Sequence, residues 1–150
     1  MTVTVRSAEL IDVPALLVIE QQALGAPHWT VAEYSRLVES EIVLVAEELG
    51  RTCGFVCAKI VAGEWEIENV AVALEFLRRG VASTLIHDLI RRAESKSVSA
   101  ILLEVRESNL PARRLYEKHG FREVGRRRGY YQSPVEEAIL YSLKLGYGTI

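Results

Sequence analysis

The sequence contains few residues that could form a disulfide or hold a metal. Its two cysteines, Cys53 and Cys57, lie four residues apart in a strand-like segment. Such a segment would hold their Cα atoms about 13 Å apart, too far for a disulfide. The three histidines, His28, His87 and His119, have no spacing typical of metal ligands. We therefore expect two reduced thiols in the core and no bound metal.

Long apolar runs and a strong net charge are also missing. The sequence contains no stretch of about 18 apolar residues, the length needed to span a membrane, and the N-terminus lacks the pattern of a signal peptide. The net charge of −2 provides no basic field, which disfavours nucleic-acid binding. With four prolines, 49% hydrophobic and 25% charged residues, the composition is globular. We expect a cytoplasmic protein that binds neither membranes nor nucleic acid directly. The sequence leaves its oligomeric state open.

The pattern of apolar residues predicts a single α/β (α+β) domain over residues 1–150, because no repeat or linker divides the chain. The predicted helices cover residues 12–25, with Asp12 as the N-cap and Gly25 as the stop, and 30–40, 80–96 and 109–119. The predicted strands cover residues 2–6, 42–47, 53–61, 65–72, 100–105, 121–131 and 138–145. This order predicts a mostly antiparallel sheet with one βαβ crossover, from Val70 through the helix 80–96 to Val105. The sequence leaves open whether the tail 146–150 is ordered.

The segment from Leu77 to Ala82 precedes the helix with the clearest apolar periodicity. Small residues there allow backbone N–H groups to approach a ligand, and a helix N-terminus carries partial positive charge. Arg78 and Arg79 add full charges. These features favour a phosphate or pyrophosphate site, although an ordinary strand-to-helix turn with Gly80 serving its geometry fits equally well. Neither a dinucleotide fingerprint nor a P-loop is present.

Glu104 lies within the otherwise apolar strand 100–105. A carboxylate there must be paired, face a cleft or have a shifted pKa, and ligands often bind near the C-terminal ends of such strands. The alternative is an ion pair with Arg106 or another arginine. Asn109 and Tyr116 lie seven residues apart, on one face of the following helix. Asn109 could cap that helix and donate to a ligand, and Tyr116 could supply a phenol or simply fill the core.

These segments together resemble the GNAT superfamily of N-acetyltransferases. The resemblance rests on L-R-R-G-V-A before a helix, L-E-V-R-E-S-N, N-x-x-A-x-x-L-Y-E-K-x-G-F and R-x-x-Y-Y, and covers nearly the whole chain. It implies a mixed seven-stranded sheet flanked by four helices and splayed between strands 4 and 5. Within the superfamily the chain looks most like the bacterial ribosomal-protein alanine N-acetyltransferase (RimI) group, whose apolar turn the segment 26–30 resembles.

The resemblance also implies roles for individual residues, with acetyl-CoA as cosubstrate and no metal. The implied donor-binding residues are Val70, Ala71 and Val72 through their backbone, Arg78, Arg79, Gly80, Val81, Ala82 and Ser83 at the pyrophosphate, and Asn109 on the CoA arm. Glu104 would accept a proton and Tyr116 would donate one. The candidate acceptor contacts are Trp29, which fits a core anchor equally well, Tyr34, Tyr130 and Tyr131. Because Tyr130 and Tyr131 are neighbours in a strand, we expect one of them at most to face the substrate.

Two departures from the family pattern concern the donor and the acceptor. Leu77 stands where the family has Gln or Arg, and the segment 132–138 is shorter than the family's. A peptide α-amine costs only about 1 kcal/mol to deprotonate at pH 7, against about 4.6 for a lysine, so a single carboxylate suffices for an N-terminus. The predicted function is acetyl transfer from acetyl-CoA to a protein N-terminal α-amine, an alanine of a ribosomal protein. The alternatives are a small-molecule amine, a lysine side chain or a non-catalytic CoA-binding module.

Overall fold

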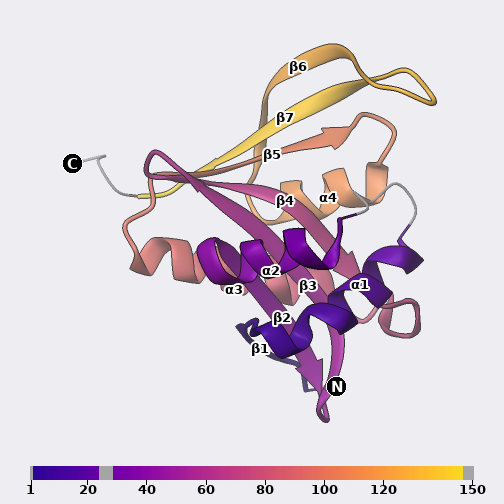
Figure 1. Ribbon diagram of the computed structural model, residues 1–150. Helices are drawn as coiled ribbons and strands as arrows, with labels where there is room; N and C mark the ends of the chain where they lie inside the picture. The colour runs from indigo at the N-terminus through magenta and orange to yellow at the C-terminus, as the bar shows by residue number, and fades with distance from the viewer. Residues whose placement is uncertain (1, 24–28, 147–150) are drawn as a thin grey trace.

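The computed structural model describes residues 2–23 and 29–146 (Figure 1). The helices are α1 (Val13–Gln22), α2 (Val31–Ser40), α3 (Val81–Ser95) and α4 (Leu110–Lys118), with short 3-10 helices η1 (Leu10–Asp12) and η2 (Leu74–Phe76). The strands are β1 (Thr4–Ser7), β2 (Ile42–Glu48), β3 (Arg51–Val61), β4 (Glu64–Val72), β5 (Ala100–Arg106), β6 (Arg122–Tyr131) and β7 (Glu136–Lys144). The predicted order of helices and strands is confirmed. Within these ranges no helix is long and apolar enough to cross a membrane.

Some predicted features lie outside the described residues. They are the helix stop at Gly25, residues 26–28 of the turn, and residues 147–150 of the tail.

All seven strands form one sheet in the order β1-β2-β3-β4-β5-β7-β6. Among the described strands only β4 and β5 pair in parallel, which confirms the predicted crossover. Their pairing ends at Ile67 and Leu103, although β4 continues to Val72 and β5 to Arg106. Beyond that pair the two strands diverge, so the expected splay between strands 4 and 5 is confirmed.

A β-bulge in β4 changes which side chains face which side of the sheet. Cys57 of β3 pairs with Asn69, and the next residue, Ala58, pairs with Ile67, which leaves Glu68 without a partner on β3. A bulge inserts one residue and shifts the strand's alternation. Glu68 and Asn69 therefore face the same side of the sheet, which a regular strand would not allow.

Helices cover both faces of the sheet. A Cβ at Gly54 on β3 would contact Val81 and Leu85 of α3, while the next residue, Phe55, meets the ring of Tyr34 on α2. Because neighbouring strand residues point to opposite faces, α2 and α3 lie on opposite sides. The β6–β7 hairpin extends past these helices (Figure 1). Both cysteines are free and buried in the core, as predicted.

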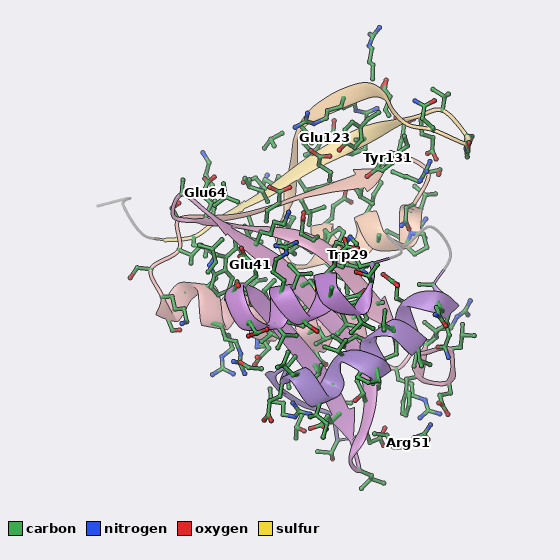
Figure 2. The ribbon with its side chains drawn as sticks, in the orientation of Figure 1. Trp29, Glu41, Arg51, Glu64, Glu123 and Tyr131 are labelled. Carbon is green, nitrogen blue, oxygen red and sulfur yellow. The ribbon has the colours of Figure 1, made fainter. Side chains whose placement is uncertain are left out.

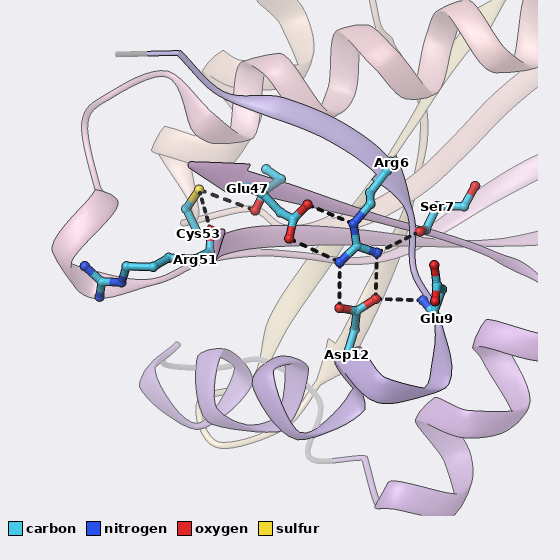
Figure 3. Close-up of polar contacts among 8 residues, drawn as sticks. Arg6, Ser7, Glu9, Asp12, Glu47, Arg51 and Cys53 are labelled. Atoms are coloured by element: carbon cyan, nitrogen blue, oxygen red, sulfur yellow. Dashed lines mark hydrogen bonds and ion pairs between the residues drawn. The ribbon is translucent and has the colours of Figure 1, made fainter. Parts of the chain in front are cut away.

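Arg6 on β1 connects the start of the chain to the sheet (Figure 3). Its Nη1 donates to Asp12 Oδ2 and its Nε donates to Glu47 Oε1, each at 2.8 Å. Asp12 Oδ2 also accepts from the backbone nitrogen of Glu9 at 2.7 Å, and these bonds, chiefly that from Arg6, hold the pKa of Asp12 below its usual value. Asp12 is the N-cap residue of α1, as predicted, but its side chain forms no capping hydrogen bond, because the charge-assisted bonds to Arg6 occupy its carboxylate.

Candidate active site

A cavity of about 540 Å³ lies where β4 and β5 diverge. It is lined by Ala23, Glu66, Ile67, Glu68, Asn69, Val70, Leu103, Glu104, Val105, Arg106, Asn109, Ala112, Tyr116, Tyr130 and Tyr131. The cavity therefore brings together predicted site residues from β4, β5, β6 and α4. A volume of this size is typical of a site for a small molecule or for part of a larger ligand.

Glu104 directly follows Leu103, the last residue of β5 that pairs with β4. Its side chain is 22% exposed and lines the cavity, and its Oε1 lies 2.9 Å from Nε of Arg127 on β6. The expected ion pair with an arginine is confirmed, with Arg127 as the partner, and Glu104 also lies at the cavity; its role as proton acceptor stays a prediction. The ion pair stabilises a carboxylate at the edge of the opening and fixes its orientation.

Tyr116 on α4 lines the same cavity and is 8% exposed. Its ring packs against Phe121 and Tyr141, with ring centres 5.7 and 6.4 Å away. Burial, with a smaller contribution from Tyr131, raises the pKa of Tyr116 to about 12. The hydroxyl forms no hydrogen bond with any side chain or backbone group of the described ranges. It therefore stays protonated at neutral pH and can donate its proton to a base formed in the cavity.

Two further carboxylates line the cavity, and neither was expected there from the sequence. Glu66 pairs in register with Leu102, which places it on the same face of the sheet as Glu104. Glu68 lies 3.1 Å from Lys59, whereas Glu66 forms no ion pair or hydrogen bond with a described residue. Burial, then Glu68 and Glu104, raise the pKa of Glu66. Glu66 is thus the carboxylate of this wall that has no ion pair with a described residue.

Asn109 serves as the predicted cap of α4. Its Oδ1 accepts from the backbone nitrogen of Ala112 at 3.2 Å. Its side chain also borders the cavity, so the amide nitrogen is left for a ligand.

Tyr34 and Trp29 do not line the cavity, so nothing in its lining supports the prediction that they contact the acceptor. Tyr34 is fully buried and donates its hydroxyl to Glu20 Oε1 at 2.9 Å. The same carboxylate oxygen accepts from the backbone nitrogen of Trp29 at 2.9 Å, and the Trp29 and Tyr34 rings lie 5.3 Å apart. Trp29, which Figure 2 labels near the start of α2, and Tyr34 thus fix α2 against α1 through Glu20. Of the two interpretations of Trp29, the structure supports the core anchor.

Tyr130 and Tyr131 both line the cavity, although neighbours in a regular strand would point to opposite faces, and which of them faces a substrate stays a prediction. Arg127 pairs with Ala138 and Tyr131 pairs with Glu136, which leaves three residues of β6 opposite one residue of β7. Gly129, at φ +57°, lies in this irregular segment. The interruption breaks the alternation on which the expectation was based. The two rings lie 5.2 Å apart, edge to face.

The predicted phosphate site lies at the N-terminus of α3, outside the residues that line the cavity. Gly80 is the N-cap with φ +77°, and a Cβ there would have no atom within 4 Å. Glycine is therefore required for the backbone conformation, and the space above it is open. Arg78 and Arg79 are exposed beside it. The first-turn N–H groups, at Val81 to Ser83, have no partner within the helix and are available to an anion.

Comparisons with known proteins agree with this geometry. The sequence matches the acetyltransferase (GNAT) family over residues 15–121. It is 34% identical over 145 residues to the [ribosomal protein bS18]-alanine N-acetyltransferase of Escherichia coli (strain K12), covering 95% of this chain and 97% of that protein. It is 36% identical over 127 residues to the protein of the same name from Haemophilus influenzae, covering 84% of this chain and 86% of that one.

A solved structure shares the fold over almost the whole chain. The crystal structure of the ribosomal-protein-S18-alanine N-acetyltransferase from Escherichia coli superposes with a TM-score of 0.88 at 32% identity, covering 99% of both chains. The chain therefore belongs to the GNAT family of acetyltransferases.

Proposed function

We propose that this chain is a single-domain enzyme that transfers an acetyl group from acetyl-CoA to the N-terminal α-amine of a protein, specifically an alanine of ribosomal protein bS18. The observation that carries the proposal is the cavity between β4 and β5, which has a carboxylate at Glu104 and a protonated phenol at Tyr116. The names of the relatives at 34–36% identity support the acceptor.

The divergence of β4 and β5 suits the long arm of acetyl-CoA. Beyond Ile67, β4 has no partner on its β5 side, so those backbone groups of the segment Val70, Ala71 and Val72 that face this side are available to the amides of the arm, as in strand addition. Asn109 borders the same opening. The N-terminus of α3 from Arg78 to Ser83 would hold the pyrophosphate, because its N–H groups and positive charge favour an anion. Leu77 does not weaken this fit, since backbone groups provide most of the binding.

The chemistry needs one proton acceptor and one proton donor. Glu104, directly or through a water, would take a proton from the amine, and the neutral amine would attack the thioester carbonyl. The C–S bond then breaks, and Tyr116 would protonate the departing thiolate. Neither cysteine is required as a nucleophile. Both are buried, and burial raises the pKa of Cys53 and of Cys57, so both stay as thiols.

Glu68 and Glu104 are paired with Lys59 and Arg127, so Glu66 is the carboxylate of the cavity wall that favours a cationic acceptor over a neutral or anionic one. An α-amine is still partly neutral at pH 7, with a pKa of roughly 7.7–8.0, whereas a lysine at about 10.4 is almost fully charged. A single proton-accepting step therefore suits an N-terminus better than a lysine side chain or a polyamine.

Replacing Gly80 with valine should weaken acetyl-CoA binding by about tenfold, because a β-branched residue at positive φ is strained by roughly 1–2 kcal/mol and the turn would open. Isothermal calorimetry on the folded variant measures this. Gly50 is a matched control, since it has the same φ of +77° and a Cβ there would also meet no atom within 4 Å, but it lies in the β2–β3 turn. Gly50→Val should leave the affinity unchanged. Equal affinities for both variants would contradict the phosphate site at α3.

A pair of peptides tests the acceptor. One begins Ala-Arg with a free N-terminus and has no lysine, and the other has a blocked N-terminus and an internal lysine. We expect the free N-terminus to be acetylated faster, as measured by thiol release and mass spectrometry, because its amine loses a proton more easily. Faster acetylation of the blocked peptide would overturn the N-terminal assignment. Activity on spermidine alone would favour the small-molecule function.

A further inference from the structure

Arg106, the last residue of β5, directs its guanidinium at the turn that joins β6 to β7. Its Nη1 donates to the carbonyl of Pro134 at 3.3 Å and to Glu136 Oε2 at 3.1 Å. Its Nη2 donates to the carbonyl of Gln132 at 3.2 Å. The guanidinium carbon also lies 4.4 Å from the centre of the Tyr131 ring. A single side chain thus holds two carbonyls, a carboxylate and a ring of the same turn.

A second contact strengthens this connection. The other carboxylate oxygen of Glu136 accepts from the backbone nitrogen of Ser108 at 2.8 Å. The bonds from Ser108, and with a smaller effect that from Arg106, hold the pKa of Glu136 below its usual value. Glu136 therefore stays ionised at neutral pH, and the start of β7 remains attached to the end of β5.

The end of the hairpin is fixed by a small set of contacts. β6 is the outermost strand of the sheet and pairs only with β7, and most of its residues are exposed. Its pairing is interrupted between Arg127 and Tyr131, so Tyr130 and Tyr131 lie at the less regularly paired end of β6. In Figure 2 the labelled Tyr131 lies on this hairpin, away from the helices of the other face. Arg106 is the side chain that contacts both the turn and the Tyr131 ring. Two other contacts tie the hairpin to β5 and the segment after it: Arg127 pairs with Glu104, and the backbone nitrogen of Glu107 donates to the carbonyl of Glu137.

We propose that Arg106 is a positioning residue that holds the Tyr131 wall of the cavity at a fixed distance from Glu104 and thereby sets how the acceptor binds. Arg106 and Glu104 are two residues apart on β5 and share a face. The contacts of the Arg106 guanidinium therefore fix the distance between Glu104 and the Tyr131 ring on the opposite wall. The proposal rests on the acetyltransferase function but on no particular acceptor. It assigns to Arg106 an effect on the acceptor and none on acetyl-CoA.

Only an arginine can make this set of contacts. Its planar guanidinium stacks on a ring while its separate nitrogens donate to several oxygens, whereas a lysine offers one compact charge. Arg106→Lys should therefore retain part of the function, and Arg106→Met should lose it.

The test compares Arg106→Met and Arg106→Lys with Arg126→Met. Arg126 is a matched control, because it also pairs with glutamates near the hairpin, Glu107, Glu123 and Glu137, but does not line the cavity. We expect Arg106→Met to lower kcat/KM for the acceptor by roughly 10- to 100-fold, mainly through KM, because small displacements in a site have effects of this size. Acetyl-CoA affinity should be unchanged, and Arg126→Met should be close to wild type. Equal acceptor kcat/KM in both methionine variants would overturn the proposal, as would a parallel loss of acetyl-CoA affinity.

A double-mutant cycle with Tyr131→Ala shows whether Arg106 acts through the ring. If it does, Arg106→Met should have little further effect once the ring is gone. Fully additive losses would mean that Arg106 touches the acceptor itself and would overturn the positioning role.

The acceptor used is whichever of the two peptides and spermidine the wild-type protein turns over fastest, so a wrong acceptor assignment does not affect the result. If the wild type turned over none of them, the proposed function would fail. Hydrogen exchange would then decide on the positioning role. Arg106→Met should speed exchange in residues 129–136 and leave α3 unchanged, and unchanged exchange in both segments would overturn the role of Arg106.

Discussion

Tyr116→Phe should lower turnover by roughly 10²–10⁴-fold while acetyl-CoA affinity stays the same. The phenylalanine ring keeps the packing against Phe121 and Tyr141 and removes only the hydroxyl. With its pKa raised to about 12, the phenol is protonated throughout the neutral range, so it has a proton to donate to a thiolate. Single-turnover kinetics, with calorimetry for the affinity, measure both quantities.

Tyr141→Phe is the matched control for this experiment. Tyr141 is also buried, and its hydroxyl donates to Glu117 Oε2 at 2.7 Å and accepts from Arg113 Nε at 3.0 Å, away from the cavity lining. The control should therefore lose some stability and keep its turnover. A wild-type rate in Tyr116→Phe would return Tyr116 to a purely structural role.

Glu104→Gln should also lower turnover by roughly 10²–10⁴-fold, because the amide cannot accept the amine proton. Glu107→Gln is its counterpart outside the cavity, since Glu107 also pairs with an arginine of β6, Arg126, and is half-exposed. Turnover of the Glu107 variant should match the wild type. If Glu104→Gln retained the wild-type rate, the proton would have to leave by another route.

Glu66 is the cavity carboxylate that could accept the amine proton in place of Glu104, and the pH dependence of turnover tests this. Because burial raises the pKa of Glu66, its ionised form is lost as the pH falls through a value higher than that of an ordinary glutamate. Any residual activity of Glu104→Gln that depends on Glu66 should therefore disappear at a higher pH than that of an exposed carboxylate. Adding Glu66→Gln should remove that residual activity.

The order of elements could be predicted because local signals agree with the final packing. The helix 80–96 has a complete apolar stripe, and its buried residues Leu85, Ile86 and Leu89 are those that the stripe selects. The continuous apolar run of β5 likewise indicated a strand covered on both faces. In both elements the period of the apolar residues is enough to identify the type of element, without knowledge of which strands are its neighbours in the sheet.

The composition of the cavity wall could not be predicted in the same way, because it depends on register. Without the bulge, Glu68 and Asn69 would face opposite sides, and nothing in the local sequence shows the extra residue. The alternation of Glu64, Glu66 and Glu68 with apolar residues was visible, but it is equally typical of a solvent-facing strand. The burial of Tyr34 could not be predicted for a related reason, since its partner Glu20 lies on another helix and no local pattern pairs them.

As an outermost strand of the sheet, β6 could pair with the same strand of another copy of the protein. A long exposed edge strand offers unpaired N–H and C=O groups to any other chain and is a common starting point for aggregation. Here that edge carries Arg126, Arg127 and Arg128 in succession, followed by the irregular turn at Gly129. Antiparallel contact between two such edges would bring arginines against arginines and would meet a strand that no longer runs straight. Arg126 and Arg127, which pair with glutamates of the hairpin, of β5 and of the segment after β5, thus also disfavour edge-to-edge association between copies of the protein.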